Sequence, residues 1–136
     1  MKFLKIGALG FAASLLAAAA QAAAPPAIYT DAQAKAGAAD FTQNCAMCHG
    51  ANLEGGAGPA LIGQAFASAS NNYSVGAIFT ELSQQMPAGQ PGSLSHTQYE
   101  DIMAYILQKN GYPAGSTPIN YDKAMADTTP LVSQVK

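Results

Sequence analysis

The chain has 136 residues, a formal net charge of −2 and no arginine, and 49% of its residues are hydrophobic. This length fits a single domain. An acidic chain without a basic patch is poorly suited to bind nucleic acid or an anionic membrane surface, so we expect neither kind of partner.

Residues 1–22 have the features of a secretory signal peptide. Lys2 and Lys5 form a basic start, residues 6–20 are apolar or small, and Ala20-Gln21-Ala22 fits the small-residue cleavage motif. The apolar run is shorter than the about 20 residues that a membrane-spanning helix needs. We therefore expect cleavage, export to the periplasm or a similar compartment, and no stable membrane insertion; an uncleaved anchor is the alternative.

The first predicted helix follows an extended lead-in of residues 23–29, which contains two prolines. Thr30 and Gln33 have the spacing of a capping box, with Thr30 as the N-cap. The helix should run to about Cys45 or Cys48. A glycine-rich loop comes next.

The second and third predicted helices also have capping residues at their starts and helix-ending residues at their ends. Ser74 precedes an apolar periodicity over residues 75–82, and Met86-Pro87 ends it. Ser95 and Gln98 form another capping box. Apolar residues at helical spacing follow, and Gly111 and Pro113 stop the helix.

These patterns predict an all-α domain over residues 30–113. Residues 114–136 are mostly polar and contain two prolines, so we expect an irregular tail packed on the surface. No internal repeat or useful β-strand alternation is present.

Cys45-Ala46-Met47-Cys48-His49 is the most informative motif. Cys-x-x-Cys-His is the attachment signature of a c-type haem, in which both thiols add to the porphyrin vinyl groups. The adjacent His49 is placed to bind the iron as its proximal ligand. We therefore predict one haem c, attached through Cys45 and Cys48.

Three other interpretations of the motif explain its residues less well. A thioredoxin-like redox pair needs a βαβ context, which the sequence lacks. A zinc site needs about four ligands, but the chain has two cysteines and two histidines, with His96 far away. A disulfide between Cys45 and Cys48 leaves His49 unexplained.

Met86 is the candidate for the sixth iron ligand, because it ends a helix and is followed by a Pro-Ala-Gly turn. There are two alternatives. Met86 could be an ordinary core methionine, or His96 could be the sixth ligand; His96 begins a helix, however, and should be exposed. The other methionines are placed differently. Met1 is removed with the signal, Met47 lies between the cysteines, Met103 belongs to an apolar helix stripe and Met125 is in the tail.

Residues 30–113 resemble the class I c-type cytochromes. The matching segments are the first helix with its haem motif, the loop after it, the methionine segment and the last helix (residues 37–50, 58–63, 86–87 and 102–106). The resemblance implies the class I cytochrome c fold, with three or more helices around one covalently attached haem.

The same resemblance assigns roles to further residues. The carbonyl of Pro59 accepts a hydrogen bond from the ring of the proximal histidine, and Leu61 in the same loop contacts the haem. Tyr105 in the last helix packs against Gly37 and Phe41 in the first.

A narrower resemblance concerns residues 86–95 and 99–115. They are similar to cytochromes associated with quinoprotein (PQQ) alcohol dehydrogenases, whose catalytic β-propeller this chain is too short to contain. This implies such a dehydrogenase as electron donor, and another cytochrome or a terminal oxidase as acceptor.

These observations predict an electron carrier and not an enzyme. Ligation by His49 and Met86 fills both axial positions, and a neutral thioether favours Fe(II). The alternative is an open-site haem enzyme or gas-binding sensor in which Met86 is unligated. A subunit held permanently in a complex would have the same sequence features as a free carrier.

Overall fold

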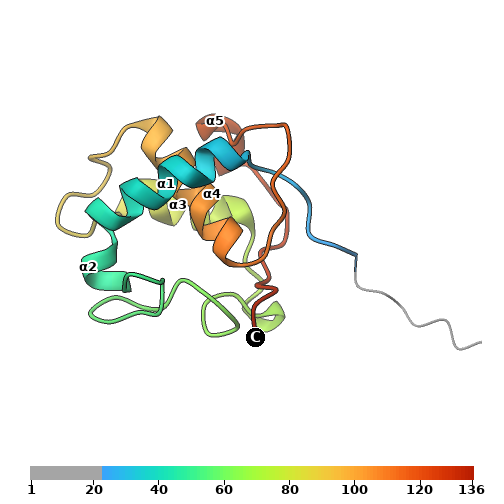
Figure 1. Cartoon of the computed structure of the whole chain (residues 1–136), viewed down its shortest axis with the longest axis horizontal. Coiled ribbons are helices and arrows are strands. Elements are labelled where there is room, and N and C mark those ends of the chain that lie inside the picture. Colours follow the sequence, from blue (N-terminus) through green and yellow to red (C-terminus); the bar gives the residue numbers. More distant parts are fainter. Residues whose placement is uncertain (1–22) are drawn as a thin grey trace, which may run out of the picture.

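The computed structural model describes residues 23–136, so the predicted signal peptide lies outside the described residues. Its helices are α1 (Asp31–Asn44), α2 (Ala46–His49), α3 (Val75–Gln85), α4 (His96–Lys109) and α5 (Tyr121–Met125), with a 3-10 turn η1 (Ala69–Asn71). Within this part of the chain no strand forms, which confirms the all-α prediction. Figure 1 shows α1 crossing α4, with α2 at one end and the loop after α2 running along the bottom.

The three predicted helix starts are confirmed. Both capping boxes are present, with Thr30 and Gln33 before α1 and Ser95 and Gln98 before α4. Ser74 accepts a hydrogen bond from the third residue of α3. None of the helices in residues 23–136 has the length and apolar character needed to cross a bilayer.

Within residues 23–136, the most extensive contact between two helices is the one between α1 and α4. Gly37 on α1 lies against the backbone of α4, and a Cβ at this position would overlap the carbonyl oxygen of Asp101. The rings of Phe41 and Tyr105 pack with their centroids 5.5 Å apart. The predicted contact of Tyr105 with Phe41 is therefore present, whereas Gly37 faces the backbone at Asp101.

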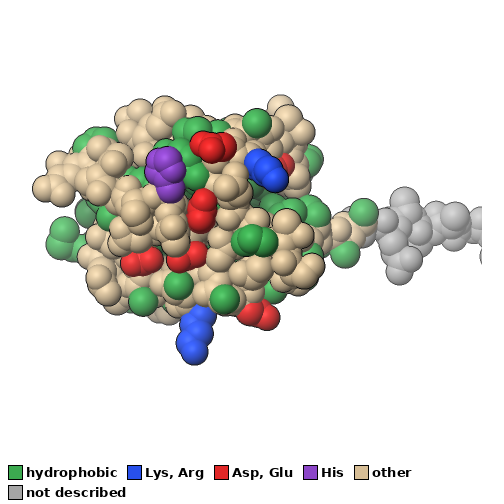
Figure 2. All heavy atoms as spheres, turned by 90° about the horizontal axis from the view of Figure 1, so that it is seen from above, with side chains coloured by type: hydrophobic (Ala, Val, Ile, Leu, Met, Phe, Trp, Pro, Cys, Tyr) green, Lys and Arg blue, Asp and Glu red, His purple; other side chains and the backbone are tan. Residues whose placement is uncertain are grey.

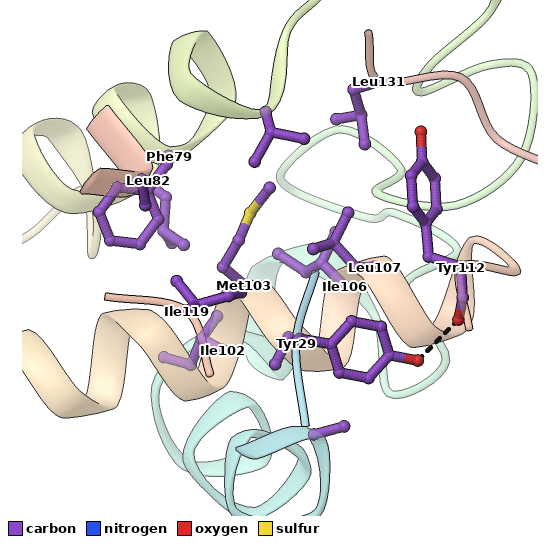
Figure 3. Close-up of a cluster of buried hydrophobic side chains, with 14 of the residues drawn as sticks. Tyr29, Phe79, Leu82, Ile102, Met103, Ile106, Leu107, Tyr112, Ile119 and Leu131 are labelled. Atoms are coloured by element: carbon purple, nitrogen blue, oxygen red, sulfur yellow. Dashed lines mark hydrogen bonds between the residues drawn. The ribbon is translucent and has the colours of Figure 1, made fainter. Parts of the chain in front are cut away.

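The core forms around α4, as Figure 3 shows. Met103 is completely buried among aliphatic and aromatic side chains, so it is a core methionine as expected. The hydroxyl of Tyr29, which lies just before α1, donates a 2.7 Å hydrogen bond to the carbonyl of Tyr112 after α4. This bond links the segment before α1 to the segment after α4.

The C-terminal segment differs from the irregular surface tail that the sequence led us to expect. It contains α5, whose N-cap Asn120 accepts a hydrogen bond from the backbone N–H of Lys123. Leu131 is fully buried, and its N–H donates to the carbonyl of Tyr73. The short segment of residues 126–136 shows no helical or strand periodicity in the sequence, yet Leu131 anchors it on the loop before α3.

We expect Gly37→Ala to destabilise the holoprotein by about 3 kcal/mol, because the new methyl group meets backbone, which cannot move aside as a side chain can. For a domain of this size that lowers the melting temperature by about 10 °C. Gly89→Ala is the control, since a Cβ at Gly89 meets nothing. Equal melting temperatures of the two variants would contradict a close helix crossing at Gly37.

Candidate functional site

A largely apolar cavity of about 740 Å³ lies between α1, α2, α3 and α4. This is within the size range of cofactor sites. All the site residues predicted from the sequence line it: Cys45, Cys48, His49, Pro59, Leu61 and Met86. The fold therefore brings together residues from segments that are far apart in the sequence.

The cysteine motif is presented by the junction of α1 and α2. Cys45 is both the C-cap of α1 and the N-cap of α2, and its carbonyl accepts hydrogen bonds from the N–H groups of Cys48 and His49. This single helical turn places both sulfurs and the imidazole along the cavity wall. The two thiols are half-buried and unbonded to each other.

The chemistry of the two thiols speaks against the alternative interpretations. Burial, followed by the charges of Asp40 and Cys48, raises the pKa of the Cys45 thiol to about 11. A catalytic redox pair needs a lowered thiol pKa instead. Residues 23–136 contain no group of three or more His, Cys, Asp or Glu side chains placed to hold a metal ion.

The ring of His49 is fixed by its surroundings. Nδ1 lies 2.8 Å from the carbonyl oxygen of Pro59, and because a carbonyl only accepts, Nδ1 carries the proton and donates. Gly58 packs on the ring, where a Cβ would lie 2.9 Å from Cε1. The hydrogen bond implied by the family resemblance is thus present. In the neutral ring with its proton on Nδ1, Nε2 is the unprotonated nitrogen, and an unprotonated imidazole nitrogen can bind a metal.

Met86 is held through its backbone at the end of α3. Its carbonyl accepts hydrogen bonds from the hydroxyl of Tyr99, at 2.7 Å, and from the N–H of Gly92, at 3.2 Å. Tyr99 is buried, so the first bond is shielded from water. In the sequence, Tyr99 is one of the apolar positions of the last predicted helix. Nothing in the sequence indicates that its hydroxyl group binds the Met86 carbonyl.

The remaining candidates lie elsewhere. His96 is exposed and stacks on Tyr121 with ring centroids 3.6 Å apart, outside the cavity. Met47 borders the cavity but is 95% exposed. Sequence reasoning missed Tyr73 and Glu81, which also line the cavity, because loop and helix-surface positions give no signal for the lining of a site.

The family comparison agrees with this geometry. Residues 32–106 match the family described as cytochrome C oxidase, cbb3-type, subunit III. The match covers more than half of the chain. The chain belongs to this cytochrome c family. It therefore binds haem c covalently through Cys45 and Cys48, and the half-buried thiols at the wall of an apolar cavity suit that attachment.

One solved structure is similar to the chain: the sulfane dehydrogenase SoxCD from Paracoccus pantotrophus, with 24% sequence identity and a TM-score of 0.53. The similarity covers 76% of this chain and 60% of that chain. At this identity it shows a shared fold only. No curated protein matches the chain.

Proposed function

We propose that this cytochrome is an exported one-electron carrier in which His49 and Met86 are the two axial ligands of its haem. The observation that carries the proposal is that both residues line one cavity from separate segments, each fixed by a short hydrogen bond. When bound, the haem supplies a one-electron Fe(III)/Fe(II) couple. The signal-like residues 1–22 support export to the periplasm, where c-type haem is attached.

Filled axial positions favour a carrier over an enzyme. A thioether from Met86 leaves no open position for oxygen, peroxide or a substrate, and it stabilises Fe(II). Pro87, Ala88 and Gly89, which follow Met86 at the cavity, offer no acid or base. Glu81 and Tyr73 are ionisable groups of the lining that an open-site enzyme or gas sensor could use, so the ligation of Met86 decides between the two functions.

The proposed partners are an electron-donating dehydrogenase and an electron-accepting cytochrome or terminal oxidase. The segments 86–95 and 99–115 support a quinoprotein (PQQ) alcohol dehydrogenase as the donor. The family description names an oxidase, which supports an oxidase as the acceptor. A free carrier and a fixed subunit of a complex would use the same haem chemistry.

The ligation proposal predicts a low-spin haem in the mature protein. The weak long-wavelength charge-transfer band of methionine-ligated ferric haem should disappear in Met86→Ala. It should persist in Met103→Ala, because Met103 lies in the core away from the cavity lining. A high-spin spectrum of the unmodified protein, or rapid binding of carbon monoxide to its reduced form, would support the open-site alternative.

Tyr99→Phe should loosen the segment that holds Met86 without removing the ligand. Loss of a buried hydrogen bond costs about 1 kcal/mol, so imidazole should displace Met86 with about fivefold higher affinity. Tyr112→Phe is a matched control, because the Tyr112 hydroxyl also donates to a backbone carbonyl, that of Pro130. An equal imidazole affinity in both variants would show that Tyr99 does not restrain Met86.

The cavity mouth is suited to an uncharged partner surface. Met47 and Tyr73 are the large hydrophobic side chains exposed among residues 23–136, at 95% and 38%, and both border the cavity. No lysine lines the cavity. We therefore infer that apolar contact, rather than charge pairing, dominates docking at this mouth.

This inference predicts that the rate of haem reduction by the quinoprotein dehydrogenase depends only weakly on salt. Ala88→Glu should lower the rate about tenfold, because it places a charge in the contact, which corresponds to about 1.4 kcal/mol. Ala36→Glu adds the same charge on the exposed side of α1 and should change little. A steep fall of the rate with salt would mean that charge pairing dominates, and the absence of any reduction would exclude this donor.

A further inference from the structure

Asp101 is an acidic residue in an unusual position, at the close crossing of α1 and α4. It is only 8% exposed, and its backbone carbonyl faces Gly37. The next residue, Ile102, lines the haem cavity. Asp101 is therefore one residue from the cavity lining, and a carboxyl group would not be expected to be buried at such a helix crossing.

A second acid, Asp40, faces Asp101 from α1. One oxygen of Asp40 accepts a hydrogen bond from the side chain of Gln98 on α4, at 3.2 Å. Asp40 also precedes a residue of the cavity wall, Phe41. Each helix thus carries an acid one residue before a residue of the cavity wall.

The surroundings of Asp101 disfavour its negative charge. Burial, then Asp40, then Glu100 raise the pKa of its carboxyl group to about 6. Glu100 itself lies on α4 and accepts a hydrogen bond from the N–H of Tyr121 on α5. Figure 2 shows acidic side chains spread over the face of the molecule that is seen from above.

The field of Asp40 reaches the site of haem attachment. Asp40 contributes to the raised pKa of the Cys45 thiol, so it is near enough to influence the charge of that sulfur. In the mature protein the same sulfur is bonded to the porphyrin. Asp101 lies one residue from Ile102 in the cavity lining, so a charge on either acid is expected to interact with the charge of the haem.

We propose that Asp101, paired with Asp40, is a proton-binding site coupled to reduction of the haem. The electron comes from the donor protein and converts Fe(III) to Fe(II), while the Asp101 carboxylate takes one proton from solvent and becomes a carboxylic acid. The inference rests on the proposed carrier function, because it needs a haem that cycles between these two states.

The direction of the coupling follows from the charges. Reduction removes one positive charge from the haem, so the nearby carboxylate is less stabilised and its pKa is higher in the reduced protein than in the oxidised protein. Protons then favour reduction. The reduction potential should fall with rising pH across a window around pH 6, and it should be constant on either side.

The test is a spectroelectrochemical titration of the holoprotein between pH 4.5 and 8. We expect the potential of the unmodified protein to fall through the window and that of Asp101→Asn to stay flat there. Asp40→Asn should keep the dependence but move it to lower pH, since one repulsive charge is gone. Asp122→Asn removes an exposed carboxylate on α5 and should behave as the unmodified protein.

A flat potential in the unmodified protein, or an unchanged pH dependence in Asp101→Asn, would overturn the inference. In the second case Glu81, which lines the cavity, or the haem carboxyl groups would be the source. A reversible one-electron titration at any fixed pH still supports the carrier function, so the two proposals fail separately.

Folding of Asp101→Asn can be checked independently. A raised carboxyl pKa in the folded state means that ionisation destabilises the fold, and this penalty grows from about pH 4 to pH 6 and is complete above that range. The variant lacks the penalty, so its melting temperature at pH 7 should equal or exceed that of the unmodified protein.

Discussion

The close crossing of α1 and α4 is the constraint on which the site depends. Gly37 lets the backbones approach, and α1 then leads without a loop into Cys45 and α2. On the other helix, Ile102 and Ile106 form part of the cavity wall. A change in the crossing would move the attachment cysteines relative to that wall, so the position of one glycine controls the shape of the cofactor site.

The two proposed iron ligands are restrained by the same physical device, a short hydrogen bond that involves a backbone carbonyl. His49 donates to the carbonyl of Pro59, whereas the carbonyl of Met86 itself accepts from Tyr99. Neither restraint uses an ion pair, so neither depends strongly on salt. A ligand set held in this way moves little when the iron changes its charge, which suits rapid electron transfer.

Features that depend on a few neighbouring residues could be predicted from the sequence. The capping boxes at Thr30 and Ser95 need two specified residues each, and the Cys-x-x-Cys-His motif needs three within five positions. The burial of Leu131 could not be predicted, because the segment of residues 126–136 is too short and irregular to show a periodicity. Asp101 was hidden for a related reason: a charged residue in a helix indicates an exposed face unless the packing partner is known.

The burial of Asp101 is best understood together with the crossing that causes it. The glycine that permits the close approach also brings the acid under the opposite helix, where Asp40 adds repulsion. An uncharged side chain would fill this place without the cost of desolvating a carboxylate. A proton site coupled to the haem would give this cost a function, because Phe41 and Ile102, which follow the two acids in the sequence, line the haem cavity. The packing that shapes the cavity thereby also sets the electrostatic environment of the cofactor inside it.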